Sequence, residues 1–117
     1  MPKIETITRE VLVKINKKFT KTGIRSNPEL DSIIYKVGKT RGINQKAATL
    51  LIEIIRRHPF VDGNKRTAFD AMIVFLEANN KKLDVRDSSK MNVIFWVVRP
   101  KTNVKDIAVW IANHTRW

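Results

Sequence analysis

Residues 58–66 read His-Pro-Phe-Val-Asp-Gly-Asn-Lys-Arg, and they separate two apolar helical patterns. Before them, residues 44–57 carry apolar side chains on more than one face, which is typical of a buried helix. After them, a second helix is expected to start beside Asn64 and to run to about Asn79, with Asn79-Asn80 as its C-cap. The sequence therefore predicts a short turn between two core helices.

Helical patterns also cover the ends of the chain. A helix near residues 8–19, capped by Thr8, would place four apolar side chains on one face (Val11, Leu12, Ile15 and Phe19). Asn27-Pro28 is interpreted as the N-cap and first position of a further helix that ends at Gly38. Thr102 or Asn103 is expected to cap a last helix, whose apolar face comprises Val104, Ile107, Ala108 and Ile111.

Residues 93–98 are less clear, because they read Val-Ile-Phe-Trp-Val-Val and such β-branched and aromatic runs also form strands. We prefer a helix, since Pro100 would end it and no second strand is visible to pair with it. Asp87-Ser88-Ser89 offers its start. The predicted fold is all-α: a compact bundle of about six helices, with residues 1–117 forming a single domain.

The composition limits the classes of function. A chain of 117 residues with 43% hydrophobic content suits one globular domain. It has no cysteine, which excludes disulfides and thiolate metal sites, and its two histidines, His58 and His114, make a structural zinc site unfavourable. We find no run of membrane-spanning length and no signal-peptide pattern, so we expect a cytoplasmic protein without a membrane partner.

The net charge of +12 allows two interpretations. Lysines cluster on the first predicted helix and its exit (Lys14, Lys17, Lys18 and Lys21). They form either a solvated surface or the footprint of an acidic partner, and both interpretations stay open. No aromatic side chains interleave with them as a base-stacking surface requires, so nucleic-acid binding is not expected.

The residue types of the 58–66 stretch suit the handling of phosphate. A helix that begins beside Gly63 would expose N–H groups to an anion, and glycine lets the backbone approach it closely. Lys65 and Arg66 add positive charge for phosphate oxygens. Asp62 could hold Mg²⁺ against the phosphates, and His58 could accept a proton from an attacking hydroxyl.

Each of these residues also has an ordinary interpretation. Singly, His58 would be a structural histidine, Asp62 a helix N-cap, and Lys65 and Arg66 a charged first turn. Phe60 is expected in the core in either case. The combination favours a phosphate site, because capping alone does not require so many specified residues together.

The nine residues, followed by Thr67-Ala68, resemble the signature of the Fic/Doc family in its Doc (death-on-curing) form. Gly23-Ile24-Arg25 resembles the segment ahead of that signature more weakly. The resemblance implies a small all-helical bundle that transfers a phosphate-containing group from a nucleotide to a protein hydroxyl. The site residues that it implies are His58 as base, Asp62 as Mg²⁺ ligand, and Gly63, Asn64, Lys65, Arg66 and, less closely, Arg56 as nucleotide and phosphate contacts.

The position of Lys65 bears on which group is moved. Fic proteins mostly transfer AMP, and their signature has a second glycine at the Lys65 position and a further arginine where this chain has Phe69. Doc has lysine there and is a kinase of a translation elongation factor. The resemblance therefore favours transfer of the γ-phosphate of ATP to a Ser or Thr hydroxyl, with Mg²⁺; protein AMP (nucleotidyl) transfer is the alternative.

Doc is also the toxin of a toxin–antitoxin pair, so the resemblance implies an antitoxin chain as partner. Thr6 to Glu10 fits the spacing of an inhibitory motif in some Fic proteins, but Val11 replaces the residue that usually follows the glutamate. We therefore expect inhibition by a separate, acidic antitoxin chain. A third hypothesis, a non-catalytic basic binding module acting through Lys14, Lys17 and Lys18, leaves the histidine without a role.

Overall fold

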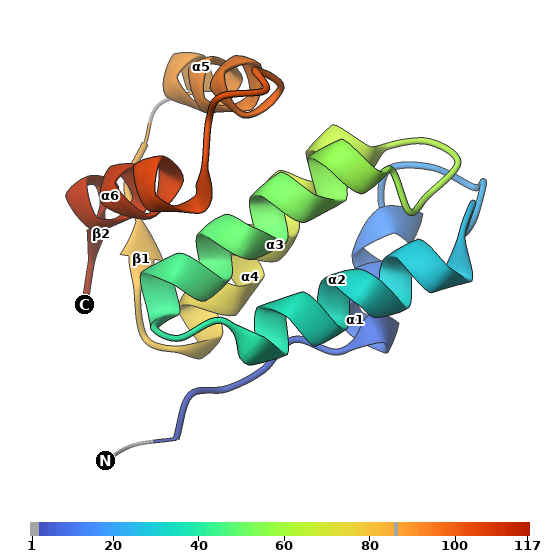
Figure 1. The fold of residues 1–117 in the computed structure, drawn as a ribbon, viewed down its shortest axis with the longest axis horizontal. Helices are drawn as coiled ribbons and strands as arrows, with labels where there is room; N and C mark the ends of the chain where they lie inside the picture. The colour runs from blue at the N-terminus through green and yellow to red at the C-terminus, as the bar shows by residue number, and fades with distance from the viewer. Residues whose placement is uncertain (1–2, 86) are drawn as a thin grey trace.

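The fold is built around two neighbouring helices, α3 (Ile43–Arg57) and α4 (Asn64–Ala78). The computed structural model describes residues 3–85 and 87–117, with the backbone alone at residues 87–89. In α3, nine consecutive residues from Ala47 to Ile55 are buried, as predicted for a central helix. Figure 1 shows α3 in the middle of the molecule, flanked by other helices on both sides.

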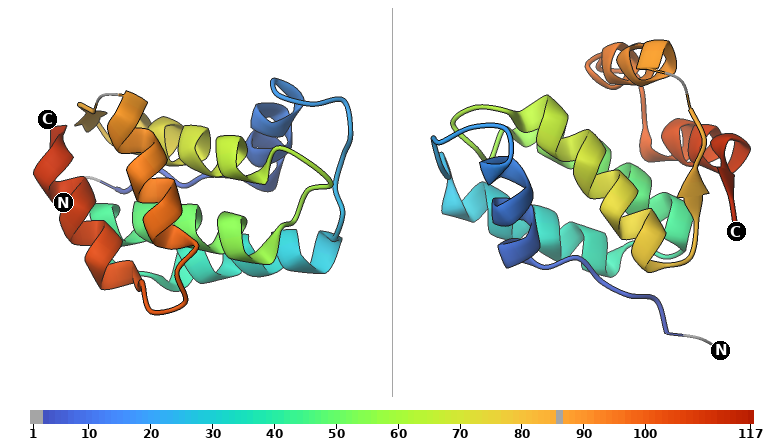
Figure 2. Two further views of the ribbon diagram at one scale, coloured as in Figure 1. Left: turned by 90° about the horizontal axis from the view of Figure 1, so that it is seen from above. Right: turned by 180° about the vertical axis from the view of Figure 1, so that it is seen from behind.

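The remaining helices cover this pair. On one side lie α1 (Arg9–Lys17), which packs on α4, and α2 (Asn27–Lys39), which packs on α3. On the other side, α6 (Val104–His114) packs on α3, and α5 (Asp87–Val97) precedes it. Both views in Figure 2 place α1 beside the N-terminal end of α4. The all-α prediction is confirmed.

Two short strands were not predicted. β1 (Lys82–Leu83) and β2 (Thr115–Arg116) pair antiparallel, with Lys82 opposite Arg116 and Leu83 opposite Thr115. Strands of two residues leave no alternating pattern in the sequence, which explains why the sequence does not reveal them. The pair joins the end of the chain to the segment that follows α4.

Capping residues define most helix ends as predicted. Thr8 accepts a hydrogen bond from the Val11 N–H (3.2 Å), and Asn103 forms a reciprocal capping box with Asp106. Asn79 is the C-cap of α4. Residues 93–97 are helical, which confirms the preferred alternative, and Val93 and Val97 are buried one turn apart.

Both ends of α2 differ from the prediction. The N-cap of α2 is Ser26, which accepts from the Glu29 N–H at 3.2 Å, and Asn27 lies in the first turn; both residue types cap well, so the sequence does not decide between them. α2 passes Gly38 to Lys39, because the Thr40 hydroxyl donates to the Lys36 carbonyl (2.8 Å) and caps it there. The helix start predicted at Asp87-Ser88-Ser89 matches the backbone of α5, but its side chains lie outside the described ones.

A charged cluster joins α2 to the end of α3. Glu53 is 8% exposed and accepts from Lys36 Nζ (2.6 Å) and Arg57 Nε (2.5 Å), and Arg57 also contacts Glu29 (3.4 Å). Burial alone would raise the pKa of Glu53, but hydrogen bonds and charge from Lys36 and Arg57 outweigh it and lower that pKa. The cluster fixes the last turn of α3, directly before His58.

This cluster predicts a pH-dependent contribution to stability. Because the pKa of Glu53 is lowered on folding, its contribution is complete above the unfolded value of about 4.3 and is lost as the pH falls through the folded value. At pH 7, Glu53→Gln should lower the free energy of unfolding by about 1–2 kcal/mol, less than for a fully buried pair because Lys36 and Arg57 are partly exposed. Urea unfolding from pH 7 to pH 3 measures this, and the difference from the parent should shrink in acid. The exposed Glu77→Gln serves as control; an equal effect of both variants would contradict the prediction.

Candidate active site

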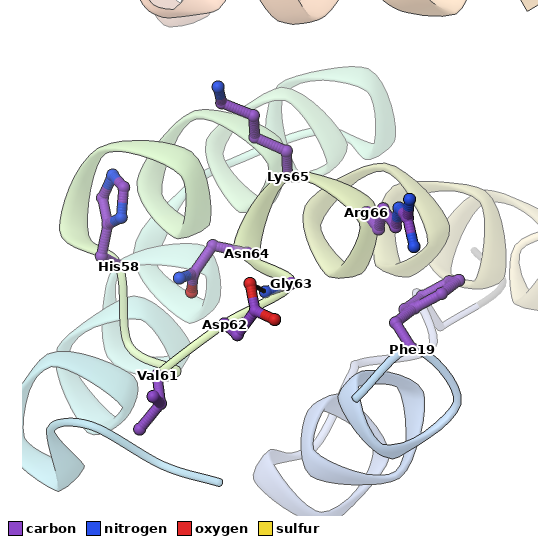
Figure 3. Close-up of a pocket in the computed structure, with 8 residues that line it drawn as sticks. All are labelled: Phe19, His58, Val61, Asp62, Gly63, Asn64, Lys65 and Arg66. Atoms are coloured by element: carbon purple, nitrogen blue, oxygen red, sulfur yellow. Dashed lines mark hydrogen bonds between the residues drawn. The ribbon is translucent and has the colours of Figure 1, made fainter. Parts of the chain in front are cut away.

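A pocket of about 470 Å³ lies at the turn between α3 and α4. Its lining residues are Phe19, His58, Val61, Asp62, Gly63, Asn64, Lys65 and Arg66. All of them except Phe19 come from the nine-residue stretch (Figure 3). The structure therefore gathers the predicted base, carboxylate and cations around one cavity.

His58 ends α3 in the left-handed region (φ 50°, ψ 60°), with its N–H bonded to the Ile54 carbonyl (3.1 Å). Residues other than glycine adopt this conformation uncommonly, so it is favoured where the surroundings stabilise it. Arg25 does so, because its guanidinium donates to the carbonyls of Arg57 (2.7 Å) and His58 (2.5 Å) and its N–H donates to that of Pro59 (2.8 Å). The imidazole is left exposed at the pocket, and no described residue hydrogen-bonds to it.

Asn64 closes the turn. Its side-chain Oδ1 accepts from the Phe60 N–H (3.0 Å) and its Nδ2 donates to the Phe60 carbonyl (2.9 Å), and the residue is 8% exposed. Phe60 is buried in the core, as predicted. The amide of Asn64 is thus occupied by the loop backbone, so a phosphate contact by Asn64 would use its main-chain N–H.

The first turn of α4 presents unpaired N–H groups. Gly63 is the N-cap at φ +74° and has no side chain to cap them, and the first helical bond runs from the Thr67 N–H to the Gly63 carbonyl (2.8 Å). Within the described chain, the N–H groups of residues 64–66 have no hydrogen-bond partner. They are the donors that an anion at a helix N-terminus would bind.

The charged side chains of the pocket are available to a ligand. Lys65 and Arg66 are exposed, and neither forms an ion pair with a described residue. Figure 3 shows Lys65 on the side of His58 and Arg66 on the side of Phe19, with Asp62 between them at the turn. Positive charge on two sides of one carboxylate suits an anion that carries a metal ion.

Asp62 fits a magnesium site that a nucleotide would complete. Its Oδ1 accepts from the Gly63 N–H (2.8 Å), while its Oδ2 has no partner among the described residues. The described chain holds no group of three side chains able to bind a metal ion. Mg²⁺ usually takes one or two carboxylates together with phosphates and water, so a single carboxylate beside a phosphate cradle is a suitable donor set.

Arg56 does not line this pocket. Its guanidinium donates to the main-chain carbonyls of Val97 (3.1 Å), Arg99 (2.9 Å) and Thr102 (2.5 Å) at the end of α5. His58, by contrast, follows the last helical residue of α3 and lines the pocket. The structure therefore does not bring Arg56 to this pocket, and the phosphate contact that the resemblance suggests for it stays a prediction.

The segment from Thr6 to Glu10 lies at a different pocket, of about 430 Å³, which it lines together with parts of α2, α3 and α4. Glu10 is not among the residues that line the pocket of the nine-residue stretch. This arrangement gives no support to an inhibitory role of the Thr6–Glu10 pattern.

Phe19 is a pocket residue that the sequence did not indicate. Its predicted place on the apolar face of the first helix was wrong, because α1 ends at Lys17 and Phe19 is 36% exposed. The only signal was its position just after a run of lysines, which does not distinguish a core residue from a pocket wall.

Comparisons with known proteins agree with the motif. The sequence model of the Fic/DOC family matches residues 25–76, which is just under half of the chain and contains the whole nine-residue stretch. A curated protein from Mycolicibacterium smegmatis, named Toxin Doc, is 44% identical over 50 residues; the match covers 43% of this chain and 38% of that protein. The chain thus matches well under half of the length of this relative.

In the part of this chain that the structure describes, no helix has the length and apolar character of a membrane span.

The two hydrogen bonds between the Asn64 side chain and the Phe60 backbone predict that substitution of Asn64 strongly lowers the stability of the fold. Asn64→Ala should leave the buried Phe60 N–H and carbonyl without partners and lower the free energy of unfolding by about 2–3 kcal/mol. Urea unfolding measures this. Lys65→Ala, at the neighbouring exposed residue, should change it by less than about 0.5 kcal/mol. Similar losses for both variants would show that the Asn64 amide does not support the turn.

Proposed function

We propose, from the Fic/Doc family sequence of residues 25–76, that this chain is a Doc-like toxin that transfers the γ-phosphate of ATP to a Ser or Thr hydroxyl of a target protein. A translation elongation factor is the target that the Doc resemblance suggests. The observation that carries the proposal is the pocket itself. It brings an exposed imidazole, one carboxylate, two cations and the first N–H groups of α4 to one cavity, and these cations and N–H groups have no ion-pair or hydrogen-bond partner among the described residues.

The proposed chemistry assigns each group one task. The target hydroxyl attacks the γ-phosphorus, the bond from that phosphorus to the β-phosphate oxygen breaks, and ADP leaves. His58 accepts the hydroxyl proton. Lys65, Arg66 and the N–H groups of residues 64–66 stabilise the negative charge of the phosphates. When bound by Asp62, Mg²⁺ would supply further charge neutralisation.

Lys65 supports phosphoryl transfer over AMP transfer. It extends into the pocket region on the side of His58, where the Fic signature has a glycine. A long cation beside the base leaves less room for the bulkier α-phosphate with its nucleoside, and it can neutralise a terminal phosphate. We therefore place the γ-phosphate next to the base.

A non-catalytic basic module has less support. Of the three lysines considered for it, Lys18 pairs with Asp70 at 2.7 Å. Lys14 and Lys17 remain exposed and suit an acidic antitoxin, which we propose as the partner chain.

Labelled ATP tests the proposal directly. The protein is incubated with cell lysate and ATP labelled at either the α- or the γ-phosphate, and we expect only the γ-label to enter protein. His58→Ala should reduce the transfer by about 10²–10⁴-fold, whereas His114→Ala, which changes the other histidine, should retain it. Circular dichroism confirms that both variants are folded. Incorporation of the α-label would instead favour AMP transfer, and an active His58→Ala would remove the proposed base.

The metal role of Asp62 gives a separate prediction. Asp62→Asn keeps an acceptor for the Gly63 N–H but removes the charge, so ATP binding should weaken more with Mg²⁺ than without it. Calorimetric titration in the presence and absence of Mg²⁺ measures both affinities. Asp84→Asn, at an exposed carboxylate beyond β1, is the matched control. Equal losses under the two conditions would leave Asp62 as a turn residue only.

A further inference from the structure

A buried amide on α1 reaches the turn from outside the nine-residue stretch. Asn16 is 1% exposed, and its Nδ2 donates to the Asp62 carbonyl (2.9 Å) and to the Thr67 hydroxyl (3.1 Å). Thr67 is completely buried in the first turn of α4. A single side chain, 46 and 51 residues away from its partners in sequence, thus contacts the chain on both sides of Gly63, at a main-chain carbonyl before it and at a side-chain hydroxyl after it.

The contact determines the orientation of one peptide group. In the peptide that joins Asp62 to Gly63, the carbonyl accepts from Asn16, and the N–H donates to the Asp62 carboxylate (2.8 Å). A peptide unit is planar, so fixing its oxygen also fixes its N–H. Asn16 therefore orients the donor that holds the Asp62 carboxylate at the pocket.

The end of α1 also packs closely beneath the turn. A Cβ atom at Gly63 would lie 3.4 Å from Asn16 Nδ2, 3.5 Å from Thr20 and 3.7 Å from the Cβ of Phe19. Further along α4, Lys18 pairs with Asp70 at 2.7 Å. The turn consequently rests on a surface formed by the end of α1 and the residues that follow it.

We propose that Asn16 is a positioning residue of the phosphate pocket: it orients the Asp62–Gly63 peptide and the first turn of α4 so that the Asp62 carboxylate and the open N–H groups face the ligand. This inference rests on the proposed function, since it concerns the binding of a magnesium nucleotide at that pocket. Asn16 itself does not line the pocket and acts through Asp62.

A purely structural tie between α1 and α4 is the competing explanation, and Asn79 offers a matched control for it. Asn79 is 7% exposed at the opposite end of α4, accepts from the Glu5 N–H (2.8 Å), and donates to the carbonyls of Glu5 (3.1 Å) and Phe75 (2.9 Å). It therefore links two segments with the same chemistry as Asn16, but away from the pocket.

The test compares Asn16→Ala with Asn79→Ala. Both variants should lower the Tm, because each removes a buried amide that forms hydrogen bonds to another segment. Calorimetric titration with ATP, with and without Mg²⁺, is then done below both Tm values. We expect Asn16→Ala to weaken binding of Mg²⁺–ATP by about 10- to 100-fold, the usual loss when a group that orients a metal ligand is removed, and to weaken binding of metal-free ATP less. Asn79→Ala should stay within about twofold of the parent.

A second variant covers the case in which Asn16→Ala does not fold. Asn16→Asp keeps the size of the side chain but replaces the donating Nδ2 by an oxygen, which cannot donate to the Asp62 carbonyl when ionised. It should show the same selective loss of Mg²⁺–ATP binding.

The outcomes separate the inference from the proposed function. If the parent binds Mg²⁺–ATP and the Asn16 variants match Asn79→Ala, the positioning role is overturned and the proposed function stands. If the parent does not bind Mg²⁺–ATP, the proposed function fails and the inference fails with it.

Discussion

The pair of hydrogen bonds between the Asn64 amide and the Phe60 backbone is the constraint on which the site depends. A turn of six residues between two core helices must bury part of its backbone, and buried N–H and carbonyl groups need partners. Asn64 supplies both for Phe60, and Phe60 fills the core beneath. The turn is thereby fixed from within, and its outer face is left free for His58, Asp62 and the start of α4.

The two ends of the turn rely on different neighbours. The guanidinium of Arg25, just before α2, donates hydrogen bonds to the last carbonyls of α3 and its C-cap. These bonds stabilise the left-handed conformation of His58. Asn16 and the end of α1 support the Asp62–Gly63 end. Every buried side-chain nitrogen and oxygen in the described part of the chain has a hydrogen-bond partner, so these supports leave no buried side-chain donor or acceptor unsatisfied. Such an arrangement gives a rigid base to exposed, reactive side chains.

The chemistry of the site could be read from the sequence because it is local. Nine adjacent residues supply the imidazole, the carboxylate and the cations of the pocket, and helical periodicity with the Thr8 and Asn103 caps predicts the helices α1 and α6. Long-range contacts could not be read. Arg56 has a suitable charge and spacing for a phosphate contact, yet three main-chain carbonyls of the α5–α6 connection bind its guanidinium. The place of Phe19 likewise depends on where α1 ends, which periodicity fixes only to within a turn.

Arg25 and Asn16, the two side chains that support the ends of the turn, differ in whether they lie within the segment that matches the family model. The segment that matches the Fic/DOC family begins at Arg25, so it includes the support of His58 but neither Asn16 nor Phe19. A side chain that acts by holding one peptide plane needs only a donor at the right place, and any helix packed beneath the turn can offer it. The residues to which we assign chemistry all lie in the nine-residue stretch, whereas the side chains that support them come from α1 and from the segment before α2. It follows that the stretch alone suggests the type of reaction that we propose, and that the geometry of the site depends on the whole helical bundle.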